Sequence, residues 1–242
     1  MPDYFEIVER DHALQNPTSA EKIRLLGERL RLGPESRVLD LACGRGGPGL
    51  LLAETFGCRV TGVELRRGFL DVARERARAA GLEDRVELVL GDAAEHRAPP
   101  ESYDVAMCLG ATFVWGGLGG TLEALAPAVG GGGHVVVGEP YWRVWPLPDD
   151  VADEGYASLA DTATRLDRHG LRLVTLIASS EDDWDGYESL HWRAAEEWLE
   201  ENDADPAAAA IRDRYLAARE RYLGWQRALL GWAIFVARKP RA

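Results

Sequence analysis

The stretch VLDLACGRGGPG, from Val38 to Gly49, decides the fold of this chain. Its first residues form an apolar run of strand length, and the glycines at 44, 46 and 49 follow in the order G-x-G-x-x-G. Alone, this order is the fingerprint of a strand-to-helix turn that cradles a dinucleotide pyrophosphate. Asp40 stands four residues before Gly44, where a nicotinamide fingerprint asks for no carboxylate. The stretch therefore predicts a strand, a tight glycine loop and a helix, and it leaves the ligand open.

On both sides of this stretch, apolar runs of strand length alternate with helical patterns. Near-continuous runs of valine and leucine, such as RVELVLGD and YDVAMCLG, are typical of strands buried on both faces of a parallel sheet. The rhythm predicts an α/β fold with a doubly wound, Rossmann-like sheet. Four glycines, Gly130 to Gly133, precede the predicted fifth strand. Because no helix follows them, we interpret them as a structural turn.

The chain is predicted to be a single domain over residues 1–242. After residue 180 the pattern becomes helical, in two pieces broken near Asn202 to Pro206, before a closing strand. The first piece places Trp184, Tyr187 and His191 on one helical face. We divide the domain into an amino-terminal arm with its helix, a ligand-binding core and a helical insertion between the sixth and seventh strands, at residues 1–35, 36–140 and 180–228.

The composition argues against several classes of partner. Among 242 residues, 40 are acidic and 28 basic, so a formal charge of -12 repels nucleic acids and anionic membranes. The three cysteines are too few and too unevenly spaced for a disulfide framework or a zinc site, so no metal is expected. No apolar run approaches the length of a membrane span, and the amino terminus has no export pattern. We expect a cytoplasmic protein that is a monomer or a homodimer.

Further carboxylates discriminate between cofactors. Glu64 ends the second predicted strand, twenty residues after Gly44, where it can accept hydrogen bonds from the ribose of a nicotinamide dinucleotide or of S-adenosylmethionine. Asp92 follows the third strand, beside the expected adenine. Asp40 lies behind the glycine loop, where it can orient an aliphatic ammonium group. Of the two cofactors, S-adenosylmethionine alone carries such an ammonium, and the sequence therefore favours it.

The motifs VLDLACGRGG, GVEL, GDA and YDVAMCLG resemble the successive motifs of class I S-adenosylmethionine-dependent methyltransferases, from about Ser36 to Pro140. Outside this core, HALQNP, GATFVWGG, GEPYWR, WDGYE, EEWLEEN and GWAIF are similar to a branch of small bacterial methyltransferases. The resemblance implies a seven-stranded, mostly parallel sheet of order 3-2-1-4-5-7-6 with a reversed last strand. One departure is the four-glycine turn, where the family usually has a Lys-Pro-Gly-Gly turn on the face away from the ligand.

The resemblance also assigns a cofactor site. The predicted cofactor-binding residues are Asp40, Ala42, Gly44, Gly46, Glu64, Leu65, Asp92, Ala93 and Leu109. In this order they follow the cofactor from its methionine part through the ribose and adenine to the sulfonium side. Within this set, Glu64 is expected to hold the ribose and Leu109 to lie on the sulfonium side. The Glu64 carboxylate is expected to be solvated when no cofactor is bound, so that its removal would hardly affect folding.

Methyl transfer from a sulfonium needs alignment and a dry site more than any particular catalytic residue. A cover is expected from three aromatic-rich segments, namely the arm up to Pro17, residues 139–150 and the helical insertion. Removal of the arm up to His12 is expected to spare the fold and much of the cofactor affinity. Candidate acceptor-contacting residues, each with core packing as its alternative, are Trp115, Tyr141, Trp142, Trp184 and Tyr187. Candidate proton acceptors, with solvation, capping or packing as their alternatives, are His12, Glu139 and Tyr141.

The sequence thus predicts a cytoplasmic enzyme that methylates a small molecule, and it leaves the acceptor and the methylated atom open. Two alternatives remain at this point. One is an NAD-dependent oxidoreductase, which only the G-x-G-x-x-G pattern favours. The other is a non-catalytic protein that binds S-adenosylmethionine.

Overall fold

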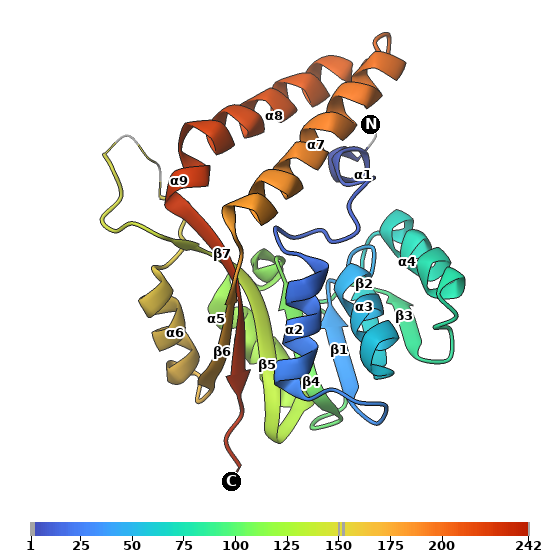
Figure 1. Ribbon diagram of the computed structural model, residues 1–242, viewed down its shortest axis with the longest axis vertical. Coiled ribbons are helices and arrows are strands. Elements are labelled where there is room, and N and C mark those ends of the chain that lie inside the picture. Colours follow the sequence, from blue (N-terminus) through green and yellow to red (C-terminus); the bar gives the residue numbers. More distant parts are fainter. Residues whose placement is uncertain (1–2, 150, 152, 242) are drawn as a thin grey trace.

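A seven-stranded sheet of order β3-β2-β1-β4-β5-β7-β6 runs through the molecule (Figure 1). The computed structural model describes residues 3–149, 151 and 153–241. Strand β7 pairs antiparallel with β5 and β6, and the remaining pairs are parallel, so the predicted fold and strand order are confirmed. The strands are β1 (Arg37–Leu41), β2 (Arg59–Glu64), β3 (Val86–Leu90), β4 (Tyr103–Leu109), β5 (Val129–Trp142), β6 (Arg172–Ala178) and β7 (Leu230–Arg238).

Helices cover both faces of the sheet and one of its ends (Figure 1). One face carries α2 (Ala20–Leu30), α3 (Gly47–Phe56) and α4 (Arg67–Ala79), and the other carries α5 (Leu118–Leu125) and α6 (Leu159–Arg168). The remaining helices lie beyond the carboxyl ends of the parallel strands: α1 (Tyr4–Val8), α7 (Glu181–Glu201), α8 (Ala208–Arg221) and α9 (Arg227–Leu229). Short 3-10 turns η1 (Thr112–Trp115) and η2 (Ala126–Ala128) flank α5, and a π-turn η3 (Tyr222–Gln226) links α8 to α9.

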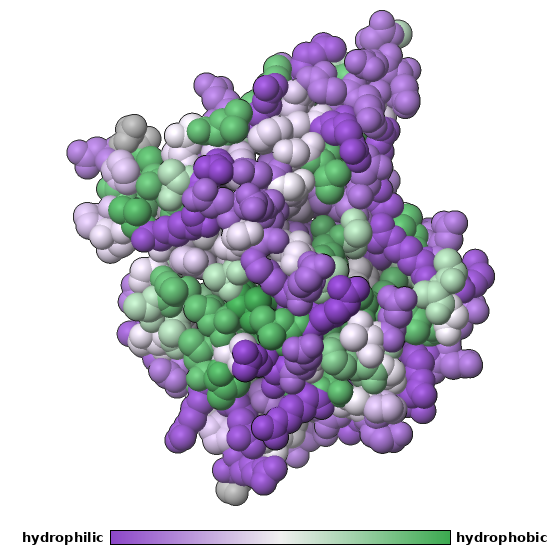
Figure 2. All heavy atoms as spheres, viewed as in Figure 1, coloured by the Kyte–Doolittle hydropathy of each residue, from purple (hydrophilic) through white to green (hydrophobic). Residues whose placement is uncertain are grey.

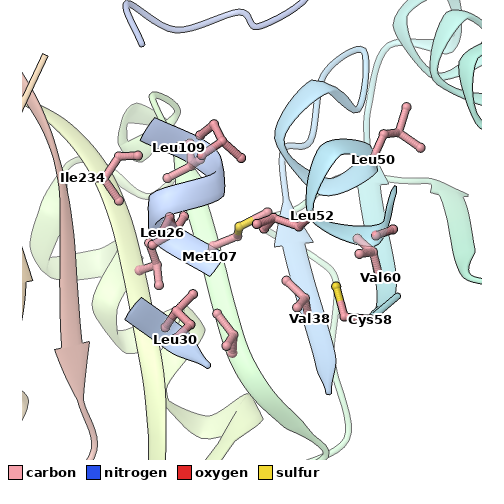
Figure 3. Packing of buried hydrophobic residues seen from close by; sticks show 14 of the residues in the cluster. Leu26, Leu30, Val38, Leu50, Leu52, Cys58, Val60, Met107, Leu109 and Ile234 are labelled. Atoms are coloured by element: carbon pink, nitrogen blue, oxygen red, sulfur yellow. The ribbon is translucent and has the colours of Figure 1, made fainter. Parts of the chain in front are cut away.

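The core consists of two apolar layers, because successive side chains of a strand point to opposite faces of the sheet. Val38 of β1 packs in the layer under α2 and α3, together with Leu26 and Met107 (Figure 3). Leu39, the next residue of β1, belongs to the layer under α5 on the other face. This alternation explains why β1 is apolar at nearly every position and why Asp40 is an exception that needs a reason.

Two serine side chains cap the amino-terminal ends of helices α2 and α7. Ser19 accepts from Lys22 N at the start of α2. Ser180 and Asp183 form a reciprocal capping box at the start of α7. The long helix α7 therefore leaves β6 at a defined point, and it carries its side chains over the strand ends.

The four glycines before the predicted fifth strand do not form a separate turn, which corrects the sequence interpretation. They lie inside β5, where the pairing with β4 shifts between Val129 and His134 and the intervening residues bulge. A β-carbon at Gly133 would lie 2.8 Å from the backbone oxygen of Asp104. Gly133 is thus required by a close backbone approach, and Gly132 by its φ of 93°.

The helical layer and the amino-terminal arm share a small core of their own. Ile7 and Val8 of α1 are buried with Leu199 of α7 and Ile211 of α8. Burying such side chains stabilises the folded state, which argues against the expectation that the arm is dispensable for the fold. Helices α7 to α9 coincide with the predicted insertion, whereas the division of the chain into parts stays a prediction.

The surface of the visible face is not uniform (Figure 2). Hydrophilic residues dominate over α7 and α8, while hydrophobic residues gather lower down, over the edge of the sheet formed by β6. Val174 and Leu176 of this edge strand are among the exposed apolar residues. Within the residues that the structure describes, no helix is both long and apolar enough to cross a membrane.

Candidate functional site

A cavity of about 310 Å³ opens at the carboxyl ends of β1, β2, β3 and β4. In doubly wound folds this edge of the sheet is where ligands bind. Eight of the nine predicted cofactor-binding residues line the cavity: Asp40, Ala42, Gly44, Glu64, Leu65, Asp92, Ala93 and Leu109. Gly46, the ninth, does not line it. Gly46 instead begins α3 with a φ of 77°, where a β-carbon would come within 3.1 Å of Ala73 of α4.

The glycine loop after β1 turns sharply at three residues of positive φ. These are Ala42 at 59°, Gly44 at 56° and Gly46 at 77°. Positive φ strains residues that have a β-carbon, which explains glycine at two of the three positions. The turn brings the backbone amide of Gly44 to the wall of the cavity, where it meets the carboxylate of Glu64.

Glu64 is anchored to the backbone on both of its oxygens. Oε2 accepts a hydrogen bond from Gly44 N at 2.9 Å, and Oε1 accepts one from Arg66 N at 2.8 Å. The side chain is only 7% exposed, so the expectation that it is solvated is wrong. A carboxylate has room for about four hydrogen bonds, which leaves two acceptor positions for a ligand. Glu64 therefore fastens the glycine loop to the end of β2 and still presents acceptors to the cavity.

Asp40 is a buried carboxyl group of β1, and one of its oxygens is unpaired. The residue is 3% exposed, and within the described residues Oδ2 has no hydrogen-bond partner. Burial, together with the negative charge of Glu64, raises the pKa of Asp40 to about 8. A buried, unpaired acid of this kind favours a ligand group that is positively charged and donates hydrogen bonds.

Asp92 and Leu109 line the cavity beyond the ends of β3 and β4. Asp92 follows β3, and its Oδ1 accepts from Ala94 N at 2.8 Å, which orients the carboxylate in a local turn. Leu109 is the last residue of β4, and Gly110 after it has a φ of 80°. The core strands thus contribute carboxylates from three of their ends and an apolar wall from the fourth.

The amino-terminal arm lies across the glycine loop and closes part of the cavity. Gln15 Oε1 accepts from Arg45 N at 2.5 Å, and the Arg45 guanidinium donates to the backbone oxygen of Glu9. Arg76 of α4 donates to the backbone oxygen of His12 at 2.9 Å. The arm adds four residues to the lining, which are Phe5, Glu9, Gln15 and Asn16. Sequence reasoning singled out HALQNP as a motif but gave none of these residues a role.

Comparison with known proteins decides what this arrangement is. Residues 38–137 match the profile of a family described as a methyltransferase domain. The chain is 36% identical over 219 residues to the uncharacterized protein YjhP of Escherichia coli, and the match spans 88% of each chain. A SAM-dependent methyltransferase from Geobacter sulfurreducens, solved with S-adenosyl-L-homocysteine, is 35% identical and superposes with a TM-score of 0.92 over 100% of this chain and 99% of its own. The corresponding complex from Thiobacillus denitrificans is 34% identical, with a TM-score of 0.92 over 99% of both chains.

The chain belongs to the class I S-adenosylmethionine-dependent methyltransferases. Its cofactor is S-adenosylmethionine, and it is an enzyme. The two alternatives, an NAD-dependent oxidoreductase and a non-catalytic binder, are set aside. Within the described part of the methyltransferase, no group of three or more His, Cys, Asp or Glu side chains is placed to hold a metal ion.

One of the five predicted acceptor-contacting residues lines the cavity of the methyltransferase. Tyr187 of α7 lies in its wall. Trp115 does not, although Phe113 and Val114 of the same turn do. The other three lie elsewhere: Trp184 packs against the core, Tyr141 covers Gly231, and Trp142, 1% exposed, donates from its indole to Asp153.

The candidate proton acceptors lie outside the cavity lining. Glu139 is buried at 8% exposure and accepts from Thr112 Oγ1 at 2.7 Å, and burial raises its pKa to about 7. This bond ties the end of β5 to η1, the turn that carries Phe113 and Val114. Tyr141 is the neighbour of Gly231 described above.

His12 is 1% exposed rather than solvated, and its ring lies 4.5 Å from that of His191. Its Nε2 is 3.0 Å from the backbone oxygen of Tyr187. Burial and the charge of His191 lower the pKa of His12. Burial opposes the charged form of His191 as well, but Glu188 and Glu9 outweigh it and raise that pKa. The cluster joins the arm to α7, so the cover is one connected body.

The predicted covering loop, residues 139–150, differs in its position from the other two predicted covering segments. Its first four residues belong to β5, and Asp150 lies outside the described residues. None of its described members lines the cavity. Residues 1 and 2 of the predicted arm and residue 242 of the predicted domain also lie outside the described residues.

Proposed function

We propose that this methyltransferase transfers the methyl group of S-adenosylmethionine to a small-molecule acceptor held in the same cavity, beneath a cover made by the arm and α7. One observation carries the proposal. The cavity is lined from below by the ends of β1 to β4 and from above by Phe5, Glu9 and Tyr187 of the cover. A ligand that fills it is enclosed between the two.

The placement of the cofactor follows from the acceptors in the lower wall. Glu64 has two free acceptor positions for the ribose hydroxyls, and Asp92 and Ala93 lie where the adenine would be bound. Asp40 would hold the ammonium of the methionine part. These assignments rest on the chemistry of the donor and acceptor set, which suits a ligand with a ribose diol and a primary ammonium.

S-adenosylmethionine would supply a methyl group on a sulfonium. An aligned nucleophile would bond to the methyl carbon as the carbon–sulfur bond breaks, and S-adenosylhomocysteine would leave as the thioether. The task of the protein is then to position the two molecules and to exclude water. Phe113, Val114 and Leu109 provide an apolar wall for this purpose. None of His12, Glu139 and Tyr141 lines the cavity, so we assign no catalytic base to the methyltransferase.

The charges of the lining bear on the class of acceptor. Four carboxyl groups, from Glu9, Asp40, Glu64 and Asp92, line the cavity beside one cation, Arg66. Arg66 is already paired with Asp3 at 3.3 Å. An anionic acceptor would meet repulsion there, so we propose a neutral or cationic small molecule. A nucleic-acid substrate is disfavoured by the same charges, and the cytoplasmic location and the oligomeric state stay predictions.

The variant Gly47→Ala tests the cover. A β-carbon at this position would collide with the backbone oxygen of Ala13, so the arm must shift although the residue lies outside the cavity lining. We expect methyl transfer to fall by about tenfold or more, because misplacement of about 1 Å can cost on the order of a hundredfold in rate. The measurement is transfer from labelled S-adenosylmethionine to a panel of amines and alcohols, with limited proteolysis of the arm alongside.

Gly186→Ala is the matched control, since a β-carbon there meets nothing within 4 Å on the covering helix α7. It should leave the transfer rate and the proteolysis pattern unchanged. Equal activity of the Gly47→Ala enzyme, with its arm demonstrably released, would refute the role of the cover. Binding of cofactor without transfer to any member of the panel would count against a small neutral or cationic acceptor.

A further inference from the structure

The arm places one unpaired amide in the cavity wall. Asn16 is 7% exposed, it lines the cavity, and within the described residues its Oδ1 has no hydrogen-bond partner. The amide lies against the turn that follows β4. A β-carbon on Gly110 would lie 2.5 Å from Asn16 Oδ1.

Hydrogen bonds hold the chain in place on both sides of Asn16. On one side, Gln15 is bonded to Arg45 N of the glycine loop at 2.5 Å. On the other, Ser179 Oγ donates to the backbone oxygen of Pro17, and Thr18 N donates to the backbone oxygen of Asn16 at 2.7 Å. A buried acceptor without a partner destabilises the folded state. Because Asn16 also lines the cofactor cavity, a ligand bound there can supply the missing donor.

The missing donor must also suit Asp40, which lines the same cavity and has a buried oxygen without a partner in the described residues. Asp40 pairs in register with Met107 of β4, and Gly110, beside Asn16, follows three residues after Met107. Both residues line the cavity, and they do so from neighbouring strand ends. A primary ammonium carries three N–H donors and no acceptor, and it can satisfy both oxygens at once.

We propose that Asn16 Oδ1 accepts a hydrogen bond from the ammonium of the methionine part of the cofactor, so that the arm belongs to the cofactor site as well as to the cover. The inference deepens the proposed function and rests on its placement of the cofactor. The two are nevertheless separable. Wild-type protein would still bind S-adenosylhomocysteine if Asn16 had no part in it.

Two ligands and one variant test the inference by calorimetry. S-adenosylhomocysteine carries the ammonium, whereas 5′-methylthioadenosine has the same nucleoside and thioether without it. Asn16→Ala is expected to weaken the binding of S-adenosylhomocysteine by about ten- to a hundredfold, which is the range for a hydrogen bond to a charged group. Its affinity for 5′-methylthioadenosine should change by no more than about twofold. The melting temperature without ligand should not fall, because no intramolecular bond is lost.

The matched control is Thr18→Val, two residues along the same arm. Thr18 Oγ1 is also buried without a partner in the described structure. Thr18 lines a groove behind the arm, which Asn16 also lines, but Thr18 does not line the cofactor cavity. This variant should bind both ligands as the wild type does.

Asn16→Asp discriminates between the two charged groups of the ligand. It keeps an acceptor oxygen but removes the amide donor, so it should bind S-adenosylhomocysteine more tightly than the alanine variant. A loss greater than that of alanine would place Asn16 at the ligand carboxylate and overturn the inference. Equal losses for the two ligands, or no loss with Asn16→Ala, would overturn it as well.

Discussion

Replacement of Glu64 by alanine is expected to weaken binding of S-adenosylhomocysteine by roughly ten- to a few hundredfold. Two hydrogen bonds from the ribose hydroxyls to this carboxylate are lost, each worth about 1.5–3 kcal/mol before water replaces part of them. The same change should lower the free energy of unfolding by about 1–3 kcal/mol, because Gly44 N and Arg66 N lose their acceptor. Calorimetry with S-adenosylhomocysteine and urea unfolding without it measure the two effects.

Glu87→Ala is the control for the loss of one negative charge, since Glu87 is exposed in the neighbouring strand β3. It should leave both quantities nearly unchanged. A Glu64→Ala protein of wild-type stability would show that the two backbone bonds contribute nothing in solution. Unchanged affinity would show that the ribose is bound elsewhere.

Replacement of Asp40 by asparagine is expected to weaken the binding of S-adenosylhomocysteine by about a hundredfold or more at pH 8. Removing one partner of a buried ion pair costs about 3–5 kcal/mol, because the other charge stays buried without its counter-charge. Binding of 5′-methylthioadenosine should hardly change, since this ligand lacks the ammonium. Calorimetric titration of the Asp40→Asn protein with both ligands at pH 8 measures the difference.

The pH dependence of the wild type gives the same residue a second test. The pKa of Asp40 is raised to about 8, so at neutral pH the unfolded chain holds this carboxyl ionised while the folded protein keeps it protonated. The free energy of unfolding should therefore fall as the pH rises from about 4 to 8. Asp40→Asn should remove the share of Asp40 and leave that of Glu139, whose pKa is raised to about 7. Affinity for S-adenosylhomocysteine should rise over pH 6 to 8, by at most about tenfold per unit, because the ammonium needs the ionised carboxylate. An affinity that does not change with pH in the wild type, or one that still rises with pH in Asp40→Asn, would contradict the assignment.

The sheet, and the strands that line the cofactor site, could be predicted because they depend on local sequence patterns. The alternating apolar runs predict the parallel strands, and the glycines directly after a strand predict the tight loop after β1. Asp40, Glu64 and Asp92 stand at the ends of three such strands, and the topology brings those ends to one edge of the sheet. Eight of the nine predicted cofactor residues line one cavity for this reason, although their contacts with the cofactor stay predictions.

The cover could not be predicted residue by residue because its contacts join distant parts of the chain. Asn16 meets Gly110, and Gln15 meets Arg45, through pairings that no periodicity reveals. The double role of Glu64 was missed for a similar reason, since a backbone N–H from another strand end leaves no pattern in the sequence. Aromatic residues drew attention to Trp142, but its place in the core depends on Asp153 and on Trp225 of η3, whose ring lies 5.8 Å away.

A crystal structure of this protein with S-adenosylhomocysteine would test the placement of the cofactor. We expect the ligand in the cavity at the ends of β1 to β4, with the ribose hydroxyls on Glu64, the adenine beside Asp92 and the ammonium between Asp40 and Asn16. The arm should remain closed over it, with Gln15 still bonded to Arg45 N. A ligand bound outside this cavity, or one whose ribose leaves Glu64 without a contact, would contradict the account.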